Sequence, residues 1–413
     1  MAGRGRPFDT NGQVINSTPQ NPTFRWDRLG VATGLSYCLL VGGLSVGVVL
    51  GELREQFSMS GIVAALHGST FGFALLIVGT LGVALSDRLG RRRVLWTSSV
   101  SMTVGVAMLC LGGSWPITLA GTAVAGFGAA LLVMIVPGLV SDHYGDARAA
   151  AFAAINGPPG IAALIYSLAI AAALALDKSW RVPYLGLMLI FAGVLAIVAL
   201  PVELPGESRQ GKFSLGHLRQ RDVLVPWLFI VNAVLAEFTV GVWTVTYLKE
   251  VGGASPGLAP LLGGCFAIGM AVSRLWMRHV IAVFGAATVS FGFIGLSIGA
   301  LMLCFMPNLA LKALGVLVMG FSAGPLYPLT VDGLYLRASS RVDSVSLGAF
   351  CALASGVAIS IGPLMLGILA DSVGLRWAIL FVPVLALSGA VIQRPPAVAY
   401  RRAARTPTAK VNS

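Results

Sequence analysis

The sequence predicts an all-α integral membrane protein in which twelve transmembrane helices form two pseudo-symmetric six-helix bundles. Three observations support this fold class. Hydrophobic residues make up 56% of the 413-residue chain and charged residues only 11%, whereas about a quarter of the residues in soluble domains are charged. Apolar runs of about 20 residues recur along the whole length. Lysine and arginine gather in alternate loops between these runs.

The twelve apolar runs are each long enough to cross a hydrocarbon core of about 30 Å as a helix. The expected spans are 30–51, 60–85, 94–112, 116–141, 149–176, 183–202, 225–248, 256–280, 284–306, 309–335, 345–370 and 377–394. The first run is too long for the core of a signal peptide and follows a polar stretch, so we expect it to be retained.

The loops between the runs differ in charge. Threading the spans from a cytoplasmic N-terminus places 22 of the 28 lysines and arginines on the cytoplasmic side, including Arg274 at the inner end of the eighth span. This asymmetry follows the positive-inside rule, so we expect both termini to be cytoplasmic and the chain to lie in the inner (plasma) membrane of a bacterium. The net charge of +12 then reflects membrane topology, and no nucleic-acid partner is expected because stacking aromatic residues do not accompany the basic ones.

A polar stretch divides the spans into six and six. The expected domains are a cytoplasmic tail at 1–29, a six-helix bundle at 30–202, a cytoplasmic loop at 203–224, a second six-helix bundle at 225–394 and a cytoplasmic tail at 395–413. Gly126 and Phe127 recur as Gly320 and Phe321 at an offset of 194 residues, which indicates an internal duplication. Duplicated halves around a midplane site are typical of transporters that work by alternating access.

Two charged junctions carry a resemblance to a known family. The junction of the second and third spans contains Leu85, Ser86, Asp87, Arg88, Gly90, Arg91 and Arg92. The junction of the last two spans contains Gly362, Pro363, Gly367, Leu369, Asp371, Gly374, Arg376 and Trp377. These motifs resemble the helix 2 to helix 3 signature and the helix 11 to helix 12 junction of the major facilitator superfamily. Ser273, Arg274, Phe284 and Gly285, together with the Gly320–Pro328 segment, are similar to its fucose-permease-like branch.

The resemblance implies that these junctions form a conformational gate. The implied gate residues are Asp87, Arg88, Gly90, Arg91, Arg92, Asp371 and Arg376. In the family, charge pairing between such residues and neighbouring helix ends holds the outward-open state and breaks during the switch. The alternative is that the arginines act only as topology anchors at the membrane surface.

Glu237 is the predicted proton-coupling residue. It lies near the middle of the seventh span, where an ionisable side chain costs about 2.5 to 3.5 kcal/mol to insert and is therefore a functional candidate. A carboxyl group that gains or loses its proton as the surrounding cavity is wetted can exchange one proton in each transport cycle. The alternative is a protonated glutamate that bonds a neighbouring helix and serves only the structure.

Polar and aromatic side chains of several spans are expected to line a substrate cavity. Trp243, Thr244 and Tyr247 share one helical face because their positions follow spacings of three and four. Glycines and prolines in the tenth span favour a bend that turns Tyr327 towards the substrate. The predicted cavity residues are Tyr37, Asn156, Asn232, Trp243, Thr244, Tyr247 and Tyr327. For Asn156, joining two helices by a hydrogen bond is an equal alternative.

These features favour a secondary active transporter of a small organic solute, coupled to protons and active as a monomer in the lipid bilayer. The alternatives are a multidrug or metabolite efflux pump of the same superfamily, passive facilitation, and a non-transporting membrane sensor that kept a transporter fold. The chain has no paired catalytic carboxylates, nucleophile motif or phosphate-binding glycine loop, and its five cysteines lack metal-like spacing. We therefore expect no enzymatic activity, no catalytic residue, no cofactor and no metal.

Overall fold

The computed structural model describes residues 24–147, 151, 154–199, 215–338, 342 and 344–392, and within these ranges all side chains except those of 82–87, 146, 278, 286, 344, 345 and 390–392. Every regular element in these ranges is a helix. The N-terminal half contains α1 (Arg28–Leu44), α2 (Val46–Gln56), α3 (Gly61–Leu89), α4 (Arg91–Leu111), α5 (Trp115–Tyr144), η1 (Gly145–Ala147), α7 (Gly157–Ala175) and α8 (Arg181–Ala199).

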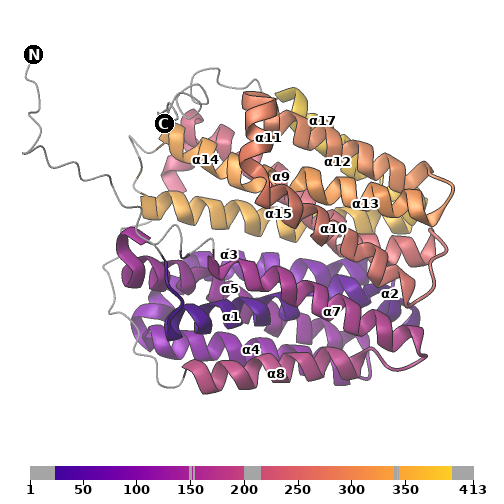
Figure 1. The fold of residues 1–413 in the computed structure, drawn as a ribbon, viewed down its shortest axis with the longest axis horizontal. Coiled ribbons are helices and arrows are strands. Elements are labelled where there is room, and N and C mark those ends of the chain that lie inside the picture. The colour runs from indigo at the N-terminus through magenta and orange to yellow at the C-terminus, as the bar shows by residue number, and fades with distance from the viewer. Residues whose placement is uncertain are drawn as a thin grey trace, which may run out of the picture.

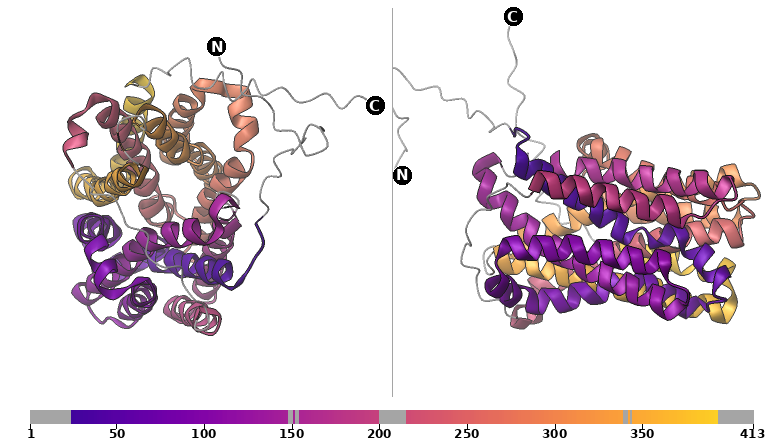
Figure 2. Two further views of the ribbon diagram at one scale, coloured as in Figure 1. Left: turned by 90° about the vertical axis from the view of Figure 1, so that its left-hand side faces the viewer. Right: turned by 90° about the horizontal axis from the view of Figure 1, so that it is seen from below.

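The C-terminal half has the same order of long helices. It contains η2 (Leu215–Arg219), α9 (Arg221–Glu250), α10 (Leu258–Leu275), α11 (Met277–Phe284), η3 (Gly285–Ala287), α12 (Thr288–Phe305), α13 (Leu309–Ala323), α14 (Leu326–Ala338), α15 (Ser344–Val373), α16 (Leu375–Ala378) and α17 (Phe381–Ile392). Figure 1 shows the N-terminal half, from indigo to magenta, beside the C-terminal half, from orange to yellow. The axes of the long helices in both halves lie roughly along one common line. Both halves are also distinct when the bundle is seen along the helices (Figure 2).

The predicted spans are confirmed as apolar helices. Within the described residues, eleven helical segments are long and apolar enough to cross a membrane, and Leu375–Gly389 is a shorter apolar segment at the position of the twelfth predicted span. Two of the eleven are interrupted: α1 meets α2 at Ser45, and α13 meets α14 at Gly324 and Pro325. The chain is therefore an integral membrane protein of the predicted all-α class. Most of the predicted loop at 203–224 lies outside the described residues, so the domain boundaries stay predictions.

The internal duplication is visible in how helices pack within each half. A Cβ atom added to Gly121 of α5 would lie 2.7 Å from the carbonyl oxygen of Gly105 in α4. A Cβ atom added to Gly315 of α13 would lie 2.8 Å from the carbonyl oxygen of Gly299 in α12. Both residue pairs are related by the predicted offset of 194 residues. The equivalent helices of the two halves thus cross at backbone contact, which requires glycine at the crossing point.

Candidate functional site

The two halves meet tightly at one end of the bundle, which we call the distal end. It carries the turns between α2 and α3 and between α9 and α10 and lies at the right in Figure 1. At this end Arg54 Nη1 lies 2.5 Å from Glu250 Oε2. Lys249 Nζ lies 2.5 Å from Glu52 Oε1 and 2.6 Å from Glu55 Oε2. These ion pairs join α2 of the N-terminal half to α9 of the C-terminal half.

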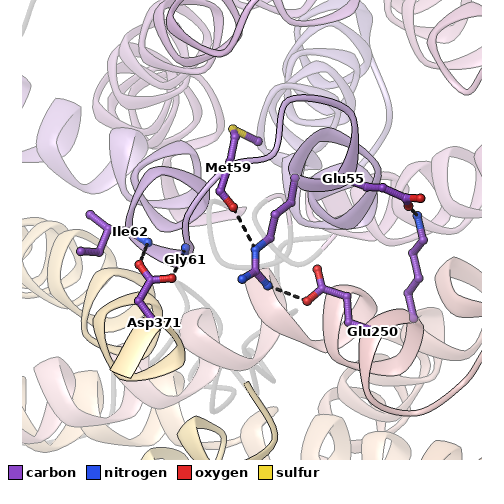
Figure 3. A network of polar contacts seen from close by, with 8 residues as sticks. Glu55, Met59, Gly61, Ile62, Glu250 and Asp371 are labelled. Atoms are coloured by element: carbon purple, nitrogen blue, oxygen red, sulfur yellow. Dashed lines mark hydrogen bonds and ion pairs between the residues drawn. The ribbon is translucent and has the colours of Figure 1, made fainter. Parts of the chain in front are cut away.

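Asp371, a predicted gate residue, makes a second connection at the distal end. Its Oδ1 accepts a hydrogen bond of 2.5 Å from the amide of Gly61, and its Oδ2 accepts one of 2.9 Å from the amide of Ile62. These amides open α3 and have no partner within that helix. A carboxylate is favourable here because it also faces the positive end of the helix dipole. Figure 3 shows this cap beside the pairing of Arg54 with Glu250. We call Asp371 and the five charged residues above the distal latch.

The other predicted gate residues lie within their own halves. Arg91, whose side chain is 8% exposed, pairs with Asp142 of α5 at 2.7 Å. Arg88 and Arg92 are exposed near the turn between α3 and α4. Arg376 stacks on the ring of Trp377 at 5.6 Å. The side chain of Asp87 lies outside the described residues, so its gating role stays a prediction.

Glycine is required where each half turns between the helices of the two charged junctions. Gly90 has φ 76° between α3 and α4, and Gly374 has φ 83° between α15 and α16. Both values fall in the region that other residues rarely adopt. The two glycines therefore hold tight turns of similar conformation at the ends of α3 and α15, although the repeat does not relate these two positions.

Glu237 and Arg274 form an ion pair in the middle of the C-terminal half. Arg274 Nη2 lies 3.9 Å from Glu237 Oε1, and the side chains are 45% and 17% exposed, respectively. Glu237 is near the midpoint of the Arg221–Glu250 span. Sequence reasoning counted Arg274 among the charges at the inner end of its span, and it missed this pairing because the position of a Cα atom does not fix the reach of a long side chain.

A proline explains where the Arg274 guanidinium is held. Its Nε donates a hydrogen bond of 3.3 Å to the carbonyl oxygen of Gly324, near the midpoint of the Leu309–Ala338 span. In a continuous helix this oxygen would accept from the amide of residue 328, but Pro328 has no N–H. The guanidinium therefore satisfies a carbonyl that the helix break leaves open.

Aromatic residues of both halves lie in the region of Glu237. Tyr327 of α14 is close enough to interact electrostatically with Glu237 and with Tyr37 of α1. Phe238, next to Glu237 in the chain, packs against Phe71 of α3 with ring centroids 6.2 Å apart. The structure thus brings together two of the predicted cavity residues, Tyr37 and Tyr327, with the predicted coupling residue.

Three other predicted cavity residues are enclosed by their own half in this conformation. Trp243 is fully buried, and its Nε1 donates to the carbonyl oxygen of Pro363 at 3.1 Å. Thr244 Oγ1 donates to the Val240 carbonyl oxygen at 2.7 Å. Tyr247 is also fully buried. These three side chains are turned into the bundle, so their contact with a substrate stays a prediction.

The two predicted asparagines lie away from the ion pair. Asn232 Nδ2 donates to the carbonyl oxygen of Leu385 at 3.1 Å and lies 3.3 Å from Ser388 Oγ, which joins α9 to α17. Asn156 is exposed at the start of α7. Both stay predictions as substrate contacts.

The path from the ion pair to the distal end is closed. A cavity of about 20 Å³, lined by side chains that include His67, Thr122, Phe238 and Val242, lies between the halves on the distal side of Phe238. This volume holds about one water molecule and no organic solute. His67 is fixed there by contacts of 2.8 Å to the Val63 carbonyl oxygen and 3.0 Å to Thr118 Oγ1. Passage of an organic solute through this part of the interface therefore requires the two halves to separate.

Comparison with known proteins agrees with this architecture. The family model of the Major Facilitator Superfamily matches residues 31–350. The chain is 26% identical to the 2-nitroimidazole transporter of Escherichia coli (strain K12) over 355 residues, which cover 82% of this chain and 87% of that protein.

Two solved structures share the fold. One is a bacterial homologue of the human lysosomal transporter Spinster in an inward-facing, unoccupied conformation, with a TM-score of 0.71 at 14% identity over 88% of this chain and 95% of that chain. The other is the nucleoside transporter NupG, with a TM-score of 0.69 at 13% identity over 88% of this chain and 96% of that chain. At these identities the likeness shows the fold alone.

Proposed function

Because the chain belongs to the Major Facilitator Superfamily and is a membrane transporter, we propose that it moves a small organic solute by proton-coupled alternating access. The observation that carries this proposal is the pair of Glu237 and Arg274 at mid-depth. An ionisable group in the middle of a membrane is costly and marks a transport pathway by default. Here a carboxyl and a guanidinium lie 3.9 Å apart, too far for a hydrogen bond.

The proton step follows from this spacing. An ionised Glu237 balances the charge of Arg274 and keeps the site neutral. When Glu237 binds a proton, the charge of Arg274 is left uncompensated, and the free energy of the site changes with the protonation state. Binding of the solute is thereby linked to binding of the proton, which is the requirement for coupled transport.

The distal latch supplies the conformational part of the proposal. Its contacts join the two halves, so they must break whenever the distal end opens. The distribution of lysine and arginine favours a distal end that faces the exterior and termini that face the cytoplasm of a bacterium. On this assignment the latched conformation is closed to the outside. We infer that one chain suffices for transport, because a single chain provides both halves around the ion pair.

The relative from Escherichia coli suggests the size and shape of the solute. Its substrate, 2-nitroimidazole, is a small planar heteroaromatic molecule. The aromatic contact between Phe238 and Phe71 beside the ion pair supports a planar solute, since aromatic faces stack on one another. We therefore propose a small planar heteroaromatic compound as the solute, and 2-nitroimidazole as the first compound to test.

The proposal is tested with Glu237→Gln in proteoliposomes. Glutamine keeps the size of the side chain but cannot bind or release a proton. We expect the variant to lose accumulation of 2-nitroimidazole driven by a pH gradient and to keep exchange of the labelled compound between two equal pools. Asp332→Asn, which changes an exposed carboxyl on α14, is the matched control and should behave as the unmodified protein. Gradient-driven accumulation that is unchanged in Glu237→Gln would remove Glu237 from the coupling role.

A further inference from the structure

The Arg274 guanidinium has hydrogen-bond donors to spare. Its Nε bonds the Gly324 carbonyl oxygen, and its Nη2 lies 3.9 Å from Glu237 Oε1, beyond hydrogen-bond distance. No other hydrogen bond or ion pair of this side chain occurs among the described residues. The two Nη groups therefore present an open edge of N–H donors, and the side chain is 45% exposed.

The position of this edge is unusual for an arginine. By their position in the chain, the described lysine and arginine residues, Arg274 included, lie near helix ends or in loops, where long side chains ordinarily extend towards the membrane surface. Arg274 is instead held at mid-depth by Gly324 and faces a single carboxylate. A guanidinium with open Nη donors matches a planar group with two oxygens, which it binds through two parallel hydrogen bonds.

The ionisable groups near Glu237 determine the net charge of the site when Glu237 is protonated. They are Arg274 of α10 and Tyr327 of α14, and Tyr327 in turn interacts with Tyr37 of α1 and Cys351 of α15. The described charged residues of α2, α13 and α15 lie towards the distal end, and the described part of α17 has none. Asp332 and Arg337 of α14 are exposed, in the part of that helix that runs away from the distal end, and the charged residues of η2 lie before the start of α9. Protonation of Glu237 therefore leaves one positive charge that no described neighbour balances, and a bound anion restores neutrality.

We propose that the solute of this transporter carries a carboxylate, which binds the Nη edge of Arg274 while Glu237 holds the proton that accompanies it. This inference rests on the proposed transport function and predicts that, among small planar aromatic compounds, those with a carboxylate bind most tightly. One negative charge and one proton then cross together, so the loaded site is as neutral as the empty one. The aromatic rings of Phe238 and Phe71 and the hydroxyl groups of Tyr37 and Tyr327 contact the rest of the solute.

The test compares acids with their amides. Nicotinate and nicotinamide, and benzoate and benzamide, differ at one group and otherwise share their shape. Their affinities for the purified protein are measured by calorimetry and by thermal stabilisation. We expect each acid to bind about tenfold to a hundredfold more tightly than its amide, as a charged pair of hydrogen bonds predicts.

Four variants assign the preference to the ion pair. Arg274→Gln should bind acid and amide equally. Arg274→Lys should keep part of the preference for acids, because lysine retains the charge but lacks the two parallel N–H donors of the guanidinium. Arg337→Gln removes an exposed arginine at the end of α14 and should keep the full preference. Glu237→Gln imitates the protonated carboxyl, so it should bind the acids more tightly than the unmodified protein does. Gel filtration and the melting temperature of each variant without ligand establish that it is folded.

The outcomes separate this inference from the transport proposal. Equal binding of acids and amides by the unmodified protein, or binding of neither acid, overturns the inference, and loss of gradient-driven transport in Glu237→Gln would still support proton coupling. A full preference for acids in Arg274→Gln also overturns it. Tight binding of acids that disappears in Arg274→Gln supports the binding of the carboxylate by Arg274, and normal transport in Glu237→Gln would then overturn only the role of Glu237 as the proton carrier.

Discussion

Replacing Asp371 by asparagine should shift the protein towards conformations that are open at the distal end. The carboxylate accepts bonds of 2.5 Å and 2.9 Å from the amides of Gly61 and Ile62. Asparagine has a single acceptor oxygen and no charge, so the variant loses one of these bonds and the attraction to the α3 dipole. At this partly exposed site the combined loss is about 1 to 2 kcal/mol. Only the latched conformation loses it, so the ratio of open to latched protein should rise by about five- to thirtyfold.

A cysteine introduced at the interface between the two halves can report the change in the ratio of open to latched protein. Thr246 of α9 is fully buried. It faces α2, where a Cβ atom on Gly51 would lie 3.6 Å from the Thr246 Cα atom. In Thr246→Cys, with half-buried Cys265 replaced by serine, a charged methanethiosulfonate reagent reacts only when the distal end opens. If opening and closing are fast, the rate of labelling is proportional to the open population, so Asp371→Asn should raise it about five- to thirtyfold.

The control is Asp177→Asn, which makes the same chemical change near the distal end. Asp177 is exposed, and asparagine tolerates its φ of 52°. Among the described residues, no hydrogen bond or ion pair joins this side chain to the C-terminal half, so the labelling rate of the variant should match that of the parent. Equal labelling rates in Asp371→Asn and Asp177→Asn would refute the reasoning, because the cap would then stabilise both conformations to the same extent.

Two further predictions concern stability. Burial raises the pKa of Asp27, but hydrogen bonds from Tyr144, the Gly30 amide and His143 outweigh it and leave the pKa below the usual value. Such a carboxyl stabilises the fold above its unfolded-state pKa and loses that contribution as the pH falls through the folded-state pKa, so the melting temperature should fall more steeply below about pH 4 than in Asp27→Asn. Gly121→Ala places a Cβ atom 2.7 Å from a carbonyl oxygen and should cost about 1 to 3 kcal/mol in detergent unfolding, whereas Gly186→Ala, with nothing within 4 Å, should cost far less.

The fold could be predicted from the sequence because the membrane makes helix length and apolar composition decisive. The repeat was also readable, since Gly126 and Gly320 both lie where the fourth helix of a half packs on the second, against Phe71 and Phe266. Glu237 could be singled out because a mid-span carboxyl is rare.

The contacts of the site could not be predicted in the same way. Arg274 reaches mid-depth only because Pro328 leaves the Gly324 carbonyl oxygen without a helical partner, a relation between two different spans. The spacing of Trp243 identified a helix face but not the direction in which that face points. Asp371 caps a helix more than 300 residues earlier in the chain, and no local pattern indicates that pairing.

Because the distal latch lies far from the ion pair, a small rotation about the ion pair produces a large displacement at the latch. Glu237 and Glu250 are thirteen residues apart on α9, which corresponds to about 20 Å of helix. If one half pivots near the ion pair by about 10°, the latch moves by about 3.5 Å while atoms at the pivot barely shift. That displacement exceeds what hydrogen bonds of 2.5 to 2.9 Å tolerate. A small rotation is therefore enough to break every latch contact at once, and the change at one end can be abrupt although the site itself scarcely moves.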